Sequence, residues 1–152
     1  MLWEHEAAGS NPVIPTMKYK NSKMQGNWAV GQAIAYWTKL GCAVSIPLTD
    51  SQDYDLLIDI CGKIAKVQVK SCTYKRAGKY VFNLSVKGGN RSYNTIKKFD
   101  KQKVDMVFVA TPEGSYLIPS FECPKNIGTC FEKYKIAVTE PMVASLPVKQ
   151  TP

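Results

Sequence analysis

The spacing of apolar residues predicts the elements in the first half of the chain. Apolar side chains recur every three to four residues after Asn27, which predicts an amphipathic helix capped by Asn27 and ended by Gly41. The apolar positions of this helix are Val30, Ala33, Ile34, Trp37 and Leu40. A short strand is expected at 43–47. A polar loop then leads into two strands, at 54–60 and 64–70, which a tight turn joins.

The second half of the chain alternates strand patterns with polar turns. Residues 80–86 alternate as a strand does, and 94–103 predict a short basic helix or helical turn. Residues 104–110 are almost all apolar, which is typical of a strand buried on both faces. Further strands are expected at 115–119 and 134–138. A helix, three or four strands in a meander, a short helix and more strands indicate an α/β fold with a mixed β-sheet flanked by helices.

The length of 152 residues fits one domain, which we expect to span 17–140. Residues 1–16 lack periodicity and are too polar for a signal peptide, so a disordered or non-native leader is expected there. Back-translation of 9–16 can reproduce the 3′ part of a tRNA gene, which favours Met17 or Met24 as the natural start; chance explains the match equally well. Residues 141–152 are expected to form a flexible tail.

Charge and residue inventory narrow the function classes. The 20 Lys and Arg residues outnumber the 12 Asp and Glu residues, and the net charge of +8 favours a polyanionic partner such as nucleic acid. The 5 cysteines have no CxxC spacing and His5 is the only histidine, which argues against a zinc site or a Ser-His-Asp or Cys-His nucleophile. Reduced thiols indicate a cytoplasmic protein, and no apolar run approaches the roughly 18 residues of a membrane span.

The hairpin formed by 54–60 and 64–70 carries the candidate chemistry. Side chains alternate between the two faces of a strand, so Lys70 shares a face with Gln68, and Asp55 comes level with them across the hairpin. A carboxylate, an amide oxygen and an ammonium group therefore converge at the open end of the hairpin. The bland alternative is that these residues form the polar face of a solvated hairpin.

Asp55 followed by Gln68-Val69-Lys70 resembles the motif of the PD-(D/E)xK nuclease superfamily, an Asp on one strand and (D/E)-x-K on the next. The preceding helix, Ile46-Pro47-Leu48 and Tyr116-Leu117-Ile118-Pro119 are similar to the same family, so the resemblance covers 25–119. By pattern the chain is closest to compact homing endonucleases and Holliday-junction-resolvase-like enzymes. The resemblance implies a restriction-endonuclease-like core.

The resemblance also implies a metal-dependent endodeoxyribonuclease. Mg²⁺ would be held by Asp55, the side-chain carbonyl of Gln68 and the main-chain carbonyl of Val69. Lys70 would orient the attacking water and stabilise the charge that develops on the phosphorus centre. Where the family usually carries a Glu on its first helix, Gln32 stands in the likeliest position and Gln25 is a weaker candidate. Two glutamines in place of acids leave Asp55 as the main carboxylate.

Double-stranded DNA is the expected partner, and cutting both strands argues for a homodimer or homotetramer. The candidate DNA contacts are Lys75, Arg76, Lys79, Lys87, Asn90, Arg91, Lys97 and Lys98. A solvated basic surface is the alternative for these residues. The leading hypothesis is a site-specific DNA endonuclease. A junction-selective resolvase and a catalytically inactive DNA-binding module of the same fold remain alternatives.

Overall fold

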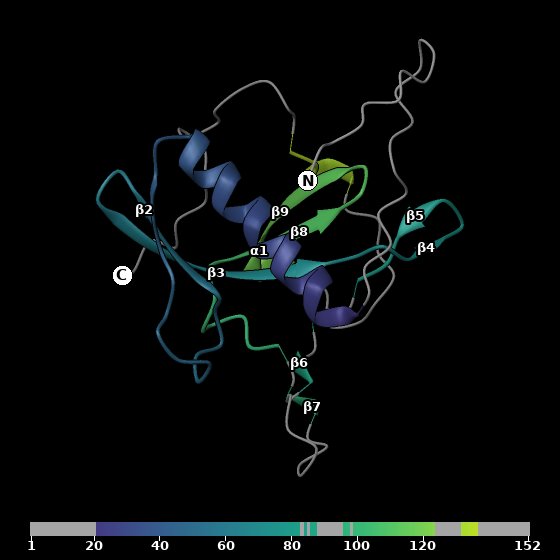
Figure 1. Cartoon of the computed structure of the whole chain (residues 1–152), viewed down its shortest axis with the longest axis horizontal. Helices are drawn as coiled ribbons and strands as arrows, with labels where there is room; N and C mark the ends of the chain where they lie inside the picture. The colour runs from purple at the N-terminus through teal and green to yellow at the C-terminus, as the bar shows by residue number, and fades with distance from the viewer. Residues whose placement is uncertain are drawn as a thin grey trace, which may run out of the picture.

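One long helix packs on one face of a central β-sheet (Figure 1). The structure is a computed structural model, and it describes residues 21–82, 84, 86–87, 96–97, 99–123 and 132–136. The predicted leader at 1–16 and the predicted tail at 141–152 lie outside the described residues.

The helix α1 spans Ser22–Lys39 and begins earlier than predicted. Its N-cap is Asn21, whose side chain accepts a hydrogen bond of 2.9 Å from the backbone N–H of Met24. Asn27 was the wrong cap because the extra turns before it are polar and add no apolar residue to the stripe. The predicted end is confirmed: Gly41 follows the C-cap residue with a φ of 78°, the left-handed conformation that glycine adopts without strain.

The main sheet has five strands in the order β1-β2-β3-β8-β9 (Figure 1). Their bounds are Ala43–Ser45 for β1, Leu56–Ile60 for β2, Lys63–Ser71 for β3, Met106–Thr111 for β8 and Gly114–Pro119 for β9. All neighbours are antiparallel except β3 and β8, which are parallel. The predicted hairpin of β2 and β3 and the mixed sheet are therefore confirmed, but the strand beside β3 comes from much later in the chain.

The parallel pair of β3 and β8 begins at Asp105, just before β8. The backbone N–H of Asp105 donates to the carbonyl of Lys66, and the Asp105 carboxylate accepts from the backbone N–H of Lys66, at 2.9 and 2.8 Å. These two bonds use both polar groups of the Lys66 backbone. The side chain of Asp105 thus fixes where the ladder starts, and with it the register of β8 against β3.

The segment between β3 and β8 forms short hairpins in place of the predicted long elements. β4 (Lys75–Arg76) pairs with β5 (Lys79–Tyr80), and β6 (Val86–Lys87) pairs with β7 (Ile96–Lys97). The predicted strand at 80–86 is wrong as a single strand, and the predicted helix at 94–103 is wrong at the two residues of β7.

The alternation at 80–86 has a different cause. Tyr80, Phe82 and Leu84 are each buried at alternate positions in the apolar cluster on one face of the sheet. An extended chain lying across a sheet face buries every second side chain just as a strand within the sheet does. The period of two was therefore correct, although the described residues 81, 82 and 84 belong to no strand.

The last described part of the chain packs beside β9. Short 3₁₀ helices occupy Ser120–Glu122 and Glu132–Tyr134, and Lys135 then forms an isolated bridge with Tyr116. The backbone N–H of Ile136 donates to the carbonyl of Ser115 at 2.8 Å. Of the strand predicted at 134–138, the described residues contain this bridge alone.

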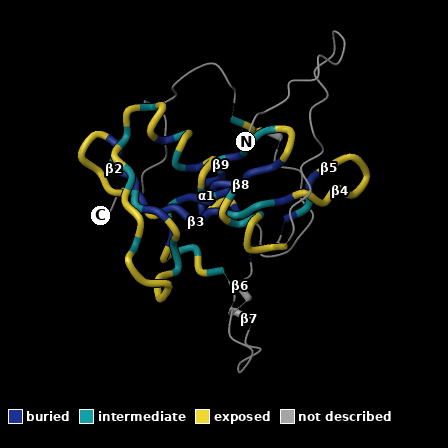
Figure 2. The backbone as a smooth tube through the Cα atoms, viewed as in Figure 1, coloured by how far each residue is buried: buried dark blue, intermediate teal, exposed yellow. Residues whose placement is uncertain are grey.

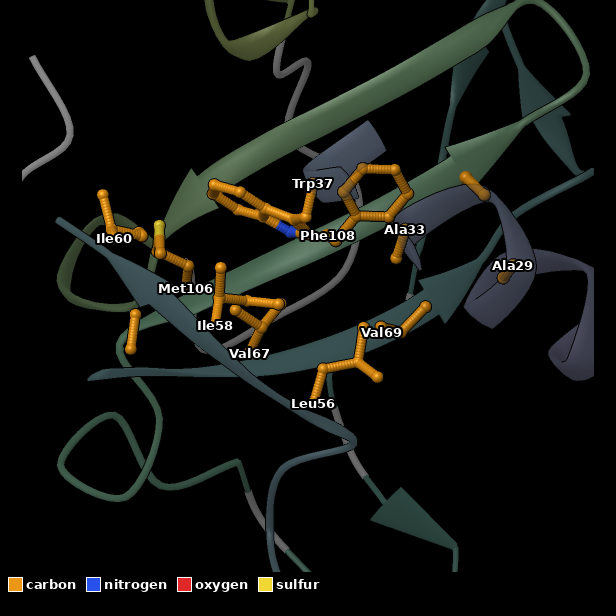
Figure 3. Close-up of a cluster of buried hydrophobic side chains, with 12 residues drawn as sticks. Ala29, Ala33, Trp37, Leu56, Ile58, Ile60, Val67, Val69, Met106 and Phe108 are labelled. Atoms are coloured by element: carbon orange, nitrogen blue, oxygen red, sulfur yellow. The ribbon is translucent and has the colours of Figure 1, made fainter. Parts of the chain in front are cut away.

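Two apolar clusters cover the two faces of the sheet, and the central strands are buried on both (Figure 2). Figure 3 shows α1 placing Ala29, Ala33 and Trp37 against one face, where they meet the alternating side chains of β2, β3 and β8. The opposite face is covered by residues from 72 onward, and no α-helix other than α1 occurs in the described part of the chain. The expected α/β fold with a helix-flanked mixed sheet is confirmed, with α1 as the flanking helix within these residues.

The thiols of Cys42, Cys61, Cys72 and Cys123 are free, as expected for reduced cysteines, and Cys130 lies outside the described residues. No helix in the described ranges is both long enough and apolar enough to cross a membrane.

We expect Ile58→Ala to lower the free energy of unfolding by about 2–5 kcal/mol, because it opens a cavity in the cluster under α1 where Ile58 is 0% exposed. Ile64→Ala is the matched control: the same side chain on the neighbouring strand is 58% exposed, and the cost should stay below about 0.5 kcal/mol. Urea denaturation of both variants measures the difference. Equal costs would contradict the placement of the core.

Candidate active site

The Asp55 side chain lies at the point where the ladder between β2 and β3 ends. The last paired residues are Leu56 and Val67, so the next backbone N–H of β3 that faces β2 has no strand partner there. Asp55 supplies one: its Oδ2 accepts from the backbone N–H of Val69 at 2.6 Å, while its own N–H donates to the carbonyl of Val67 at 2.9 Å. The backbone N–H of Val69, which needs an acceptor, therefore holds the Asp55 carboxylate against β3.

The carbonyl of Val69 faces the same side. In a β-strand, the N–H and C=O of one residue point toward the same neighbouring strand. Because the Val69 N–H points to Asp55, its carbonyl oxygen also points to the Asp55 side, beyond the end of the β2 ladder. The oxygens of Asp55 and Val69 are therefore brought to one edge of β3.

Gln68 contributes a buried oxygen that lacks a hydrogen-bond partner. Its side chain is 5% exposed, and Oε1 accepts no hydrogen bond from any described residue. It lies on the face of β3 opposite Val67 and Val69, whose side chains pack toward α1. Buried polar atoms in native proteins nearly always have a partner, so this oxygen is an acceptor that no described residue of the chain uses.

Lys70 shares the face of Gln68 and is half-buried beside Asp55. Burial lowers the pKa of the Lys70 ammonium below its ordinary value, and the charge of Asp55 opposes this in part. Burial likewise raises the pKa of the Asp55 carboxyl, and the hydrogen bond from Val69 and the charge of Lys70 counteract only part of the rise. Asp55 keeps an exposed surface and Lys70 is half-buried, so the burial that disfavours these two opposite charges is only partial.

Gln32 is not brought together with these three residues. Its side chain is exposed on α1, and α1 packs on the sheet face opposite Gln68. Gln25 is half-buried one turn before Ala29, on the stripe that faces the sheet. The catalytic role of Gln32 stays a prediction.

The candidate DNA contacts lie on the two short hairpins. Lys75, Arg76 and Lys79 are exposed on the hairpin of β4 and β5. In β6 and β7, Lys87 pairs with Ile96 and Lys97 pairs with Val86. Asn90, Arg91 and Lys98 lie outside the described residues.

Sequence reasoning missed the acidic partners of two lysines. Glu113, in the turn between β8 and β9, forms an ion pair with Lys75. Asp53, in the loop before β2, forms an ion pair with Lys103 at 3.1 Å. Both contacts join residues far apart in the sequence, so no local pattern signals them.

The family model of the PD-(D/E)XK endonucleases matches residues 20–133. The chain belongs to this family. The matched range contains the residues that resemble the family's motif, with Asp55 directly before β2 and Gln68-Val69-Lys70 on β3. No curated protein sequence matches the chain.

Among solved structures, the bacterial homing endonuclease I-Ssp6803I is similar to this chain, with 30% sequence identity and a TM-score of 0.57. The match covers 65% of this chain and 69% of that chain. This likeness confirms the restriction-endonuclease-like fold, with α1 packed on a mixed five-stranded sheet. The chain is thus a PD-(D/E)XK endonuclease similar to a homing endonuclease.

The family generally uses divalent metals, and the residues at this edge of β3 fit one. Hard cations prefer oxygen ligands, and Asp55, the orphaned Oε1 of Gln68 and the Val69 carbonyl supply three kinds of oxygen. No group of three or more His, Cys, Asp or Glu side chains gathers within the described residues. Of these three donors only Asp55 is a carboxylate, so the set should bind a cation more weakly than two carboxylates would; Asp50 lies close enough for its charge to raise the pKa of Asp55.

Without metal, Asp55→Asn should gain stability relative to the native chain as the pH rises from 4 to 7. A carboxyl whose folded pKa lies above its ordinary 3.8 favours folding at acid pH, and this contribution is lost as the pH rises through the folded pKa. The variant has no such loss. Urea denaturation in EDTA at pH 4, 5, 6 and 7 measures the gap, and a gap that shrinks toward pH 7 would contradict a raised pKa at Asp55.

Proposed function

We propose that this chain is a magnesium-dependent, site-specific endonuclease that hydrolyses phosphodiester bonds in double-stranded DNA. The observation that carries the proposal is the buried, partnerless Oε1 of Gln68 on the strand that also presents Lys70 beside Asp55. An amide oxygen in this position is costly in a merely structural hairpin. The same oxygen is useful in a metal site, because a bound cation gives it the partner that it lacks.

Each residue has a distinct part in the proposed reaction. Asp55, Gln68 and the Val69 carbonyl hold the cation; when bound, it polarises the phosphoryl oxygen and acidifies the attacking water. The ammonium of Lys70 donates a hydrogen bond to that water and stabilises the negative charge that grows on the phosphoryl oxygens. The hydrogen bond from Val69 N–H orients the Asp55 carboxylate and offsets part of the rise in its pKa.

The electrostatics of the site favour an anionic substrate bound together with a cation. Burial disfavours the charges of both Asp55 and Lys70 in the free chain. A cation beside Asp55 and a phosphate beside Lys70 would each relieve part of that cost. Binding energy in the complex therefore comes from charges that are poorly solvated before binding.

The proposed substrate is duplex DNA cut at a defined site by a homodimer or homotetramer. The net charge of +8 suits a polyanion, and the similar protein I-Ssp6803I is a homing endonuclease. One chain carries one candidate site, while a double-strand break needs two hydrolysed strands, so two chains per duplex are the simplest arrangement.

Lys70→Met should reduce DNA cleavage by about 10²–10³-fold, because it removes the charge that stabilises the transition state. Plasmid libraries incubated with the protein in Mg²⁺ or in EDTA give the test, with cut positions read by sequencing. Lys63→Met is the matched control: this lysine is exposed at the opposite end of β3, and its loss should leave the rate unchanged.

Three outcomes would overturn or change the proposal. Binding without cleavage in Mg²⁺ and Mn²⁺ would select the inactive DNA-binding module. Cleavage of four-way junctions without sequence preference would select the resolvase. Full activity in EDTA would remove the metal from the mechanism.

Gln68→Glu should raise the affinity for Mn²⁺ roughly tenfold at pH 8, since a second carboxylate adds charge to the ligand set. Electron paramagnetic resonance of free Mn²⁺ measures binding without any need for cleavage. Gln102→Glu makes the same change at an exposed turn and should have no effect. Gln32→Glu tests the remaining prediction, because a rise there would bring Gln32 into the metal site.

A further inference from the structure

The hairpin of β4 and β5 projects from the end of β3 that carries Gln68 and Lys70 (Figure 1). Figure 2 shows its tip as exposed backbone. It carries three cations, Lys75, Arg76 and Lys79. Because it follows β3 directly in the chain, its base lies next to the candidate active site.

The three cations of the hairpin differ in their surroundings. Lys75 forms an ion pair with Glu113, and its Nζ lies 4.8 Å from the ring centroid of Tyr80. Arg76 and Lys79 make no ion pair with any described residue. The positive charge of Lys75 is therefore already matched within the chain, while the charges of Arg76 and Lys79 are left for another partner.

Arg76 and Lys79 lie directly opposite each other across the ladder. Directly opposite residues in an antiparallel pair have Cβ atoms only about 5 Å apart, and like charges on such a pair disfavour the hairpin modestly because these exposed side chains can turn apart. A bound anion between them would turn this repulsion into attraction on both sides. The pairing thus penalises the free hairpin and favours the hairpin with a phosphate bound.

The hairpin is held rigidly in spite of this repulsion. Ala77 and Gly78 have φ values of 49° and 74°, the pair of positive angles that a tight two-residue turn of type I′ requires. At the base, the Cys72 thiol donates to the carbonyl of Val81 at 3.0 Å, and the backbone N–H of Val81 donates to the carbonyl of Tyr74 at 3.2 Å.

Side chains also join this hairpin to the rest of the molecule. Tyr80 is 8% exposed in the second apolar cluster, and Lys75 and Glu113 link β4 to the turn between β8 and β9. Core packing and an ion pair thus fix the direction in which the tip points. A rigid mount lowers the entropy lost when the tip binds a ligand.

We infer that the hairpin of β4 and β5 is a phosphate-binding arm, which grips the DNA backbone beside the scissile bond with Arg76 and Lys79. Lys75, which we had counted among the DNA contacts, is instead a positioning residue that acts through Glu113. The inference rests on the proposed function for its substrate. A two-stranded ribbon is narrow enough to enter the major groove, so the tip can reach the phosphates at the groove edge.

The test measures DNA binding without cleavage. The affinity of the full chain for a 30-base-pair duplex is followed by fluorescence anisotropy in EDTA at several salt concentrations. Arg76→Gln and Lys79→Gln should each reduce the slope of log K against log salt by about 0.9, and the double variant by about 1.8. Lys63→Gln, an exposed lysine at the far end of β3, should keep the native slope.

The variant Glu113→Gln distinguishes positioning from direct contact at Lys75. If Lys75 contacted phosphate itself, freeing it from Glu113 would tighten binding and steepen the salt dependence. If Lys75 positions the arm, Glu113→Gln and Lys75→Gln should weaken binding to similar extents, and the double variant should be no weaker than either. Tighter binding by Glu113→Gln would overturn the assigned role of Lys75.

The two proposals fail in different ways. Native salt slopes in both Arg76→Gln and Lys79→Gln, in a chain that still cuts DNA, would overturn the arm and leave the nuclease standing. Reduced salt slopes in Arg76→Gln and Lys79→Gln, with no DNA cleavage by the native chain, would support the arm and overturn the proposed nuclease activity. A native chain that binds no duplex would overturn both. Thermal melting at low salt gives an independent check, because Lys79→Gln relieves the repulsion and should not lower the melting temperature.

Discussion

The backbone of β3 is the constraint on which the rest of the structure depends. It is the central strand, antiparallel to β2 and parallel to β8, and every N–H that it buries must find an acceptor. Where neighbouring strands stop short, two aspartates complete the pairing: Asp105 accepts from Lys66 on the β8 side, and Asp55 accepts from Val69 on the β2 side. The bond from Lys66 to Asp105 sets the register of β8 against β3, and the bond from Val69 to Asp55 positions a candidate functional carboxylate.

The apolar clusters on both faces of β3 change the protonation equilibria of the residues at the end of this strand. They partly desolvate the end of the strand, and this partial burial raises the pKa of Asp55 and lowers that of Lys70. Such charges weaken the free fold and strengthen interactions with a cation and a phosphate, as expected for sites where stability is given up for function. The hairpin of β4 and β5 shows the same relation at the surface, where it holds the charges of Arg76 and Lys79 without an ion-pair partner among the described residues.

Sequence reasoning succeeded where the information was local. The alternation in 54–60 and 64–70 gave the hairpin, and the tight turn between them fixed the register that brings Asp55 beside Gln68 and Lys70. It failed where tertiary contacts decided. The alternation of Tyr80, Phe82 and Leu84 reflects packing on the face of the sheet, and Ile96 and Lys97 form a strand because Val86 and Lys87 are available to pair with them.

By itself, the sequence determined which side chains share a face and which residues a tight turn brings level, because strand periodicity and short loops leave few alternatives. It therefore determined the candidate triad of Asp55, Gln68 and Lys70. Only the tertiary structure decided that β8 lies beside β3, that Gln68 is buried without a partner, and that Glu113 matches the charge of Lys75. Each of these depends on segments that are distant in the chain. Burial and strand pairing bring these segments together only as the chain folds, so no local pattern predicts them.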